Sequence, residues 1–232
     1  SKNLFTNTAE YDKIYSKVND VIEDNRIKYK IEKYEISRIF SNARGVINGY
    51  AATSLDRLKN TMLYILEKCG EVWYTKMNKL LFYIDFISYR EQGAAITGLS
   101  YKAISYGPVP DRWDKIYSEF SEITQELRPV GEYTGSVLKA KAKADTSFFS
   151  DVEIEIIDKI CSSMGQYTAR GLSELSHKEE AWIINKETHS YISFDLMAAA
   201  KPSANISLST TVQALLSVKQ PLSARESVFI RA

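Results

Sequence analysis

Apolar residues recur at helical spacing along several stretches of this chain, and each stretch predicts a helix. The first strong one follows Ser54 and ends before Gly70, and its apolar face consists of Leu55, Leu58, Met62, Ile65, Leu66 and Cys69. Serine is a common N-cap and glycine a common C-terminal cap, so both bounds are marked. Three later helices are predicted, one opening at Ser150 and two within "TARGLSELSH" and "KEEAWIINKE".

The stretch between Thr75 and Gly93 is apolar on two sides. One stripe consists of Met77, Leu80, Leu81, Ile84 and Ile87, and a second of Phe82, Phe86 and Tyr89. A surface helix needs one apolar stripe, whereas a helix with two is buried on both sides. We therefore expect a central helix that Thr75 caps and Gly93 ends.

Period-two alternation predicts the strands. In residues 100–106, Tyr101, Ala103 and Ser105 alternate with Lys102, Ile104 and Tyr106. This alternation is typical of a strand, which we expect Pro108 and Pro110 to stop. The segment "DRWDKIYSEFSEITQEL" then predicts a further helix, and residues from about 127 to about 143 predict a hairpin. The fold class is therefore α+β, mainly helical with a small antiparallel sheet.

The chain divides into three predicted parts. Residues 1–53 carry two narrow helical stripes and form an N-terminal helical extension or linker. Residues 54–200 form the main domain, and residues 201–232 form a Ser/Thr-rich tail with one short helix near Val212. Because the chain starts at Ser1 and not at Met, we expect that it was trimmed from a longer protein.

Composition changes this picture little. Lys and Arg number 30 and Asp and Glu 29, so the net charge of +1 gives no support for a nucleic-acid-binding surface. The two cysteines, Cys69 and Cys161, lie in apolar helical patterns, and we expect both to be unpaired and mostly buried in a reducing compartment. No apolar run reaches the ~18 residues of a membrane span. These features favour a cytoplasmic protein that does not enter a membrane.

Few residues are candidates for chemistry. Asp85 lies within the most apolar helix, and a buried carboxylate must be hydrogen-bonded or paired. A triad of Ser173, His177 and Asp85 can be drawn, but geometry defines a triad. We favour Asp85 and His177 as structural polar residues. The glycines and histidines form no phosphate loop or metal cluster, so we expect no catalytic residues, cofactor or metal, and a protein that is not an enzyme.

The segment "KCGEVWYTKMNKLLFYIDF" also has the layout of a helix-turn-helix half. A recognition helix needs a polar face for bases and phosphates, and this one offers mainly Lys76, Asn78 and Lys79. The alternative function is therefore a winged-helix-like transcriptional regulator.

The segment "SYGPVPDRW" is a rigid turn among aromatic residues. Gly107 allows a sharp bend, and two prolines restrict the backbone. Tyr and Trp are frequent anchors of protein interfaces, because a rigid aromatic surface loses little entropy on binding. The candidate partner-binding residues are Tyr101, Tyr106, Pro108, Pro110 and Trp113. The opposing interpretation, that these residues cover the sheet from inside, stays open.

Three motifs occur in order in this chain: "MNKLLFYIDFISY", "ITGLSYKAISYGPVP" and "LSELSHKEEAW". Together they resemble the SocA-like antitoxin domain, also called Panacea, which occurs widely on phages and mobile elements. The resemblance extends from about residue 56 to about residue 200 and leaves out both ends of the chain.

The resemblance implies the antitoxin of a bacterial or phage toxin–antitoxin pair, which neutralises a cognate protein toxin by direct binding. It also implies, as a further option, a proteolytic adaptor that presents the toxin to a cytoplasmic protease. Some relatives resemble longer MqsA-like antitoxins, in which a zinc-ribbon and helix-turn-helix region precedes this domain. DNA would then be a partner only through such a missing N-terminal region or through a local basic patch.

Overall fold

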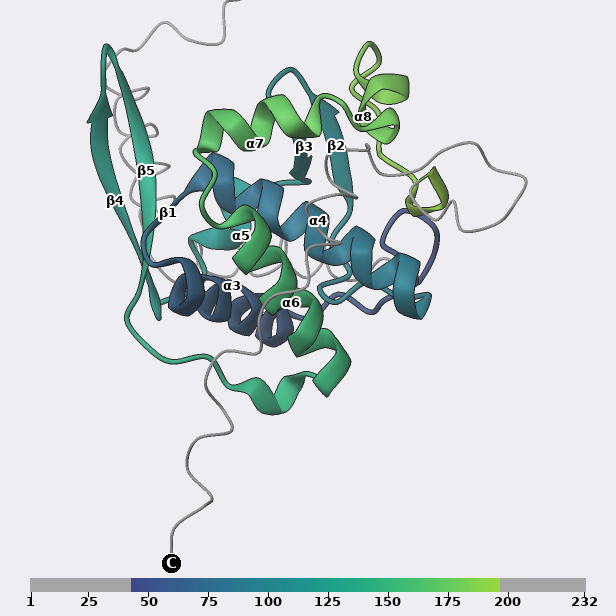
Figure 1. Cartoon of the computed structure of the whole chain (residues 1–232), viewed down its shortest axis with the longest axis horizontal. Helices are drawn as coiled ribbons and strands as arrows, with labels where there is room; N and C mark the ends of the chain where they lie inside the picture. The colour runs from purple at the N-terminus through teal and green to yellow at the C-terminus, as the bar shows by residue number, and fades with distance from the viewer. Residues whose placement is uncertain (1–42, 197–232) are drawn as a thin grey trace, which may run out of the picture. The chain divides into compact units, whose positions relative to one another are not determined.

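The computed structural model describes residues 43–196, which form six helices and two small antiparallel sheets (Figure 1). The expected N-terminal helices and the expected helix near Val212 lie outside these residues. The helices are α3 (Leu55–Cys69), α4 (Tyr74–Gln92), α5 (Trp113–Tyr117), α6 (Asp151–Met164), α7 (Ala169–Ser176) and α8 (Glu180–Asn185). Two short 3₁₀ turns add η1 (Thr146–Phe148) and η2 (Phe194–Leu196). The α+β class is therefore confirmed.

Helix ends follow the local capping signals in most places. The Ser54 hydroxyl accepts a hydrogen bond from the Arg57 amide at 3.3 Å, and Gly93 ends α4 in the left-handed conformation with φ 79°. Ser150 and Glu153 form a reciprocal capping box at the start of α6. The expected cap at Thr75 is wrong, because Val72 and Trp73 form strand β1 and the helix begins at the next residue.

Helix α4 is the central helix, as its two apolar stripes predict. Every residue from Lys76 to Ser88 is buried. Helices α6 and α7 and strand β3 pack against it (Figure 1). At its C-terminal half, Phe86 stacks on Phe194 with ring centroids 3.9 Å apart. The segment ahead of α3 also bonds to this core, since the Ala95 amide donates to Gly49 O at 2.9 Å.

The larger sheet has the order β1-β5-β4, with β1 Val72–Trp73, β4 Ile123–Val130 and β5 Tyr133–Ala140. Residues 118–127 were expected to continue the helix that starts near Asp111, and this expectation is wrong. The helix ends at Tyr117, and Ile123 opens a strand that pairs with Ala140. Pairing with the next strand of the hairpin overrides the local helical pattern here. The predicted hairpin thus starts earlier, at residue 123, and ends at residue 140.

The smaller sheet is the hairpin of β2 (Tyr101–Ile104) and β3 (Gly107–Pro110), which lies apart from the β4–β5 hairpin in Figure 1. Pro108 and Pro110 were expected to stop the strand, yet both belong to β3 and face Ala103 and Tyr101. The backbone groups of Ala103 and Tyr101 form their hydrogen bonds with another segment and not with β3. The Ala103 amide donates to Ser190 O, and Tyr101 O accepts from the Ile192 amide. The prolines therefore occupy positions where a missing N–H removes no ladder bond.

Candidate partner-binding site

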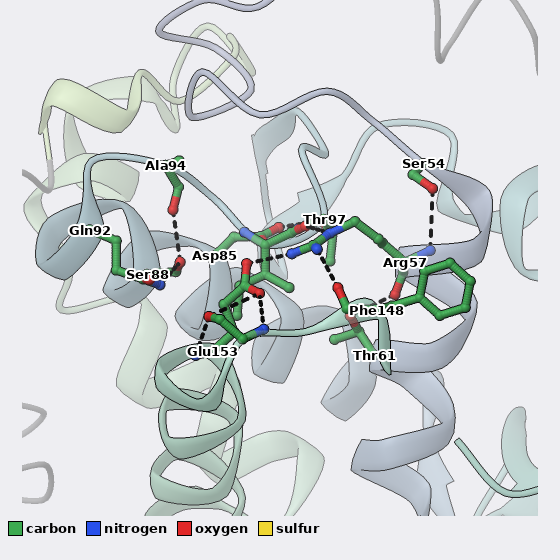
Figure 2. A network of polar contacts seen from close by, with 12 residues as sticks. Ser54, Arg57, Thr61, Asp85, Ser88, Gln92, Ala94, Thr97, Phe148 and Glu153 are labelled. Carbon is green, nitrogen blue, oxygen red and sulfur yellow. Dashed lines mark hydrogen bonds and ion pairs between the residues drawn. The ribbon is translucent and has the colours of Figure 1, made fainter. Parts of the chain in front are cut away.

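Asp85 of α4 holds the first part of the segment that leads into the β2–β3 hairpin (Figure 2). Its side chain is fully buried, and its carboxylate accepts hydrogen bonds from the amides of Ile96 at 3.0 Å and Thr97 at 2.7 Å. The Thr97 hydroxyl donates a further bond, and the Tyr101 hydroxyl donates a fourth at 2.6 Å. A buried carboxylate with this many donors is a satisfied anchor for the backbone around it.

Burial raises the pKa of the Asp85 carboxyl to about 6, while the hydrogen bonds from Thr97, Tyr101 and Ile96 act in the opposite direction. Desolvation disfavours the charged form, and donors aimed at the carboxylate favour it. The oxygens are bonded to residues 96, 97 and 101. No bond links Asp85 to His177 within residues 43–196, so the drawn triad with Ser173 is not assembled there.

Arg57 ties the same loop to two other elements (Figure 2). Its Nε donates to Ile96 O at 3.0 Å, and its Nη1 donates to Phe148 O at 2.5 Å. Its Nη2 forms an ion pair with Glu153, the N3 residue of the capping box that opens α6. The peptide groups of Ile96 are thus bonded on both sides, to Asp85 and to Arg57, which fixes the loop between α3, α4 and α6.

Lys79 of α4 holds the other end of the hairpin. Its side chain is fully buried, and its Nζ donates to Pro108 O at 2.8 Å. Burial lowers the pKa of this amine to about 7, because the charged form loses its hydration. Gly107 has φ +96°, and a Cβ there would lie 2.5 Å from Ser176 Oγ and 2.7 Å from Lys79 Cε. Only glycine allows the turn to lie this close to α4 and α7.

Helices α7 and α8 hold the hairpin from its other side. The Trp182 indole donates to Ile104 O at 2.9 Å, and the His177 ring stacks on Trp182 with centroids 4.1 Å apart. Burial, then the positive charges of Lys79 and Lys186, lower the pKa of His177. Its Nε2 is buried and has no hydrogen-bond partner among the described residues. The His177 ring therefore serves as a flat packing surface against the indole.

The five candidate partner-binding residues are not all on the surface. Tyr101 is fully buried against Asp85, and Pro108 and Pro110 are buried in β3. Their burial corrects the expectation of one presented surface. Its cause is that the Tyr101 hydroxyl is bonded to Asp85 and that β3 packs against α4, whereas Tyr106 lies in the turn between the two strands. Tyr106 is 74% exposed at the hairpin turn. Trp113 is partly exposed, with its ring 5.0 Å from that of Tyr74.

Sequence reasoning did not assign Lys79 and Trp182 to this site. The signal for Lys79 was present, because it is a lysine between two apolar stripes of a buried helix. The DNA-binding alternative relied on Lys76, Asn78 and Lys79, and the structure does not support it, because all three side chains are buried. Lys76 donates to Gly165 O at 2.5 Å, Asn78 accepts from the Tyr117 hydroxyl at 2.7 Å, and both are buried. A buried side chain cannot reach bases or phosphates.

Residues 43–196 contain neither a metal site nor a membrane-spanning helix. Within them, no three His, Cys, Asp or Glu side chains gather as a metal site would require. Among the helices of the same residues, none combines the length and the apolar character needed to cross a membrane.

Residues 77–183 match the family model described as "Antitoxin SocA-like, Panacea domain". This stretch begins within α4, contains both hairpins and ends within α8, so it includes Lys79, Asp85, Tyr106 and Trp182. The chain matches no curated protein and no solved structure.

Proposed function

Since the chain carries a SocA-like Panacea antitoxin domain, we propose that it is the antitoxin of a toxin–antitoxin pair and neutralises its toxin by direct protein–protein binding. The domain is assigned to residues 54–200, and the pair acts in the bacterial cytoplasm. The family match supports the general role. The observation that supports direct binding is an exposed aromatic ring, Tyr106, on a turn whose neighbours are fixed from two sides.

Tyr106 and Trp113 are the side chains we assign to toxin contact. Tyr106 is 74% exposed, which leaves a large amphipathic ring free for a partner. Trp113 opens α5 after Arg112, whose φ of +53° turns the chain sharply out of β3. Aromatic side chains that are already ordered lose little entropy on binding, so each can contribute ~2 kcal/mol or more to an interface.

Tyr101, Pro108 and Pro110 contribute by positioning and not by contact. Tyr101 is bonded to Asp85, and Pro108 is bonded through its carbonyl to Lys79. These interior bonds hold the hairpin in one conformation while its tip stays in solvent. The buried residues are therefore expected to affect toxin binding only through the stability and shape of the turn.

The test uses the full chain and the product of the neighbouring reading frame. Expression of that product alone should stop growth, and co-expression of this protein should restore it. Purified together, the two should elute as one complex. Growth arrest that persists at equal expression, or restored growth without any complex, would contradict neutralisation by binding.

A proteolytic-adaptor role is separable by measuring how long the toxin survives. Under simple neutralisation, the toxin accumulates in the complex, and its half-life does not change. Under adaptor action, its half-life shortens when this protein is present, and removal of the cytoplasmic protease restores it. A toxin half-life that does not depend on this protein would exclude the adaptor version and leave the binding proposal intact.

A further inference from the structure

Two thiols meet at the junction of α3 and α6. Cys69 is the last residue of α3 and is partly exposed, whereas Cys161 lies within α6 and is buried. Both are free, as predicted, but they are not isolated. Cys69 Sγ lies against Gly165, whose amide donates to Cys161 O at 2.8 Å, and the contact between the two thiols contributes to both pKa shifts. The two cysteines thus approach each other where α3 and α6 pack together.

A glycine allows this contact. A Cβ at Gly165 would lie 2.9 Å from Cys69 Sγ, so a larger residue there would push the Cys69 side chain away from α6. The carbonyl of the same glycine accepts a hydrogen bond from Lys76 Nζ at 2.5 Å. The end of α3, the start of α4 and the end of α6 are thereby fixed around the two thiols.

The charges around the pair favour one thiolate. Lys76 of α4 faces Cys69, and Lys68 of α3 forms an ion pair with Asp158 of α6 at 2.8 Å. The hydrogen bond from Cys161, together with the positive charge of Lys76, lowers the pKa of the Cys69 thiol to about 7, against the effect of burial. The bond to Cys69 and burial raise the pKa of Cys161. This asymmetry favours Cys69 as the nucleophile and Cys161 as the thiol that keeps its proton.

We propose that Cys69 and Cys161 form an oxidation site at which a hydroperoxide converts the two thiols into an intramolecular disulfide. The Cys69 thiolate attacks the terminal oxygen of the hydroperoxide, the O–O bond breaks, and the leaving alkoxide or hydroxide takes up a proton. Cys69 becomes a sulfenic acid. The Cys161 sulfur then attacks it, the S–O bond breaks, and the released hydroxide leaves as water with the Cys161 proton. Two thiols lose two hydrogens, and one hydroperoxide is reduced.

The disulfide would join two helices that are far apart in the sequence. The loop that it closes contains α4 and both hairpins, which lie between residues 69 and 161. A crosslink over a long loop restricts the unfolded chain strongly, so the oxidised protein should melt at a higher temperature than the reduced one. The site is distinct from the hairpin turn and does not depend on the toxin.

The experiment treats the native full chain with one equivalent of hydrogen peroxide, followed by a thiol-alkylating reagent under unfolding conditions and by intact-mass measurement. The expected product has lost two hydrogens, carries no alkyl group and recovers both thiols with dithiothreitol. A tryptic digest should contain one peptide pair joined through Cys69 and Cys161. Two alkylated cysteines after peroxide treatment, or disulfides formed only between molecules, would overturn the proposal.

Two variants separate the roles of the thiols. Cys161→Ser should stop at the sulfenic acid, which dimedone traps at Cys69. Cys69→Ser should lower the rate of peroxide consumption roughly tenfold or more, because the remaining thiol is buried and protonated. Equal rates for Cys69→Ser and the wild type would contradict the assignment of Cys69. If a variant fails to fold, the result for the wild type decides alone.

Discussion

Asp85 and Lys79 are buried charges on the same helix, and they hold opposite ends of one segment in unlike ways. The Asp85 carboxylate receives hydrogen bonds from Ile96, Thr97 and Tyr101, and thus has a full set of donors. The Lys79 amine donates a bond to a single carbonyl, that of Pro108. Burial shifts the two pKa values toward the neutral form of each group, upward for Asp85 and downward for Lys79. The end at residues 96–101 is held by several hydrogen bonds to a carboxylate. The end at Gly107 and Pro108 is held by one hydrogen bond and by close packing.

This difference indicates that one end stabilises the core and the other determines the shape of the exposed turn. The end at residues 96–101 forms part of the core, and its loss should unfold the domain. The end at Gly107 and Pro108 carries the exposed turn, and changes there should alter the shape of the turn before they unfold the protein. The predictions below test this division, beginning with the largest expected loss of stability.

Asp85→Ala should have the largest effect. It leaves the amides of Ile96 and Thr97 and the hydroxyl of Tyr101 buried without an acceptor. Each unsatisfied buried donor costs about 1–3 kcal/mol, so three of them predict a loss of roughly 3–9 kcal/mol in the free energy of unfolding. Urea denaturation measures it. Asp85→Asn keeps one acceptor oxygen in place and should lose clearly less; equal losses for Asn and Ala would show that the hydrogen bonds are not the cause.

Gly107→Ala should have the next largest effect. The added methyl would meet Ser176 Oγ and Lys79 Cε, and the residue would have to keep φ +96°. Strain of ~1–2 kcal/mol from the backbone and ~1–3 kcal/mol from overpacking predict a loss of roughly 2–5 kcal/mol.

Gly131→Ala, at the tip of the other hairpin, is the matched control. Gly131 has φ +61° but nothing within 4 Å of an added Cβ, so only the backbone strain of about 1 kcal/mol applies. If thermal melts show equal losses for the two variants, Gly107 does not provide the close approach that the structure shows.

The pH dependence of stability should distinguish Lys79 from a neutral residue of similar size. The pKa of Lys79 is lowered from 10.5 to about 7 on folding, so between these values the folded protein binds fewer protons than the unfolded chain. Stability from this group therefore rises as the pH rises from 7 toward 10.5, and the full penalty remains below pH 7. Relative to Lys79→Met, the wild type should gain stability over this range. A constant difference between their urea midpoints would contradict a desolvated lysine.

The sequence predicted those parts of the fold that depend on local rules. The two stripes of α4 and the caps at Ser54, Gly70 and Ser150 are confirmed, because periodicity and capping act within one or two turns. Strand β4 was missed, because residues 123–130 form a strand through pairing with residues 133–140 and not through a strong pattern of their own.

The candidate site was only partly predictable for a similar reason. The turn "YGPVP" was identified from its glycine, prolines and aromatics, but the burial of Tyr101 and the exposure of Tyr106 were not distinguished. What the sequence does not contain is the neighbour of each residue in space. Lys79 donates to Pro108 O across 29 positions, and Trp182 donates to Ile104 O across 78. Without knowledge of those contacts, Lys79 could be interpreted either as a buried donor or as a surface charge.

Tyr106→Ala should have the smallest effect on stability and the largest on binding. The ring is 74% exposed, so truncation should change the free energy of unfolding by about 0.5 kcal/mol or less. Leu127→Ala is the matched control, because Leu127 is 73% exposed and lies on the other hairpin. A loss of ~2 kcal/mol in binding, roughly thirtyfold in Kd, is expected for Tyr106→Ala alone.

The most direct measurement is therefore a calorimetric titration of the cognate toxin with Tyr106→Ala, Leu127→Ala and the wild type, each paired with a thermal melt. The account predicts three similar melting temperatures, near-equal Kd values for the wild type and Leu127→Ala, and a Kd raised roughly thirtyfold for Tyr106→Ala. A Tyr106→Ala protein that melts like the wild type and binds the toxin equally well would contradict the claim that this turn is the surface through which the toxin is neutralised.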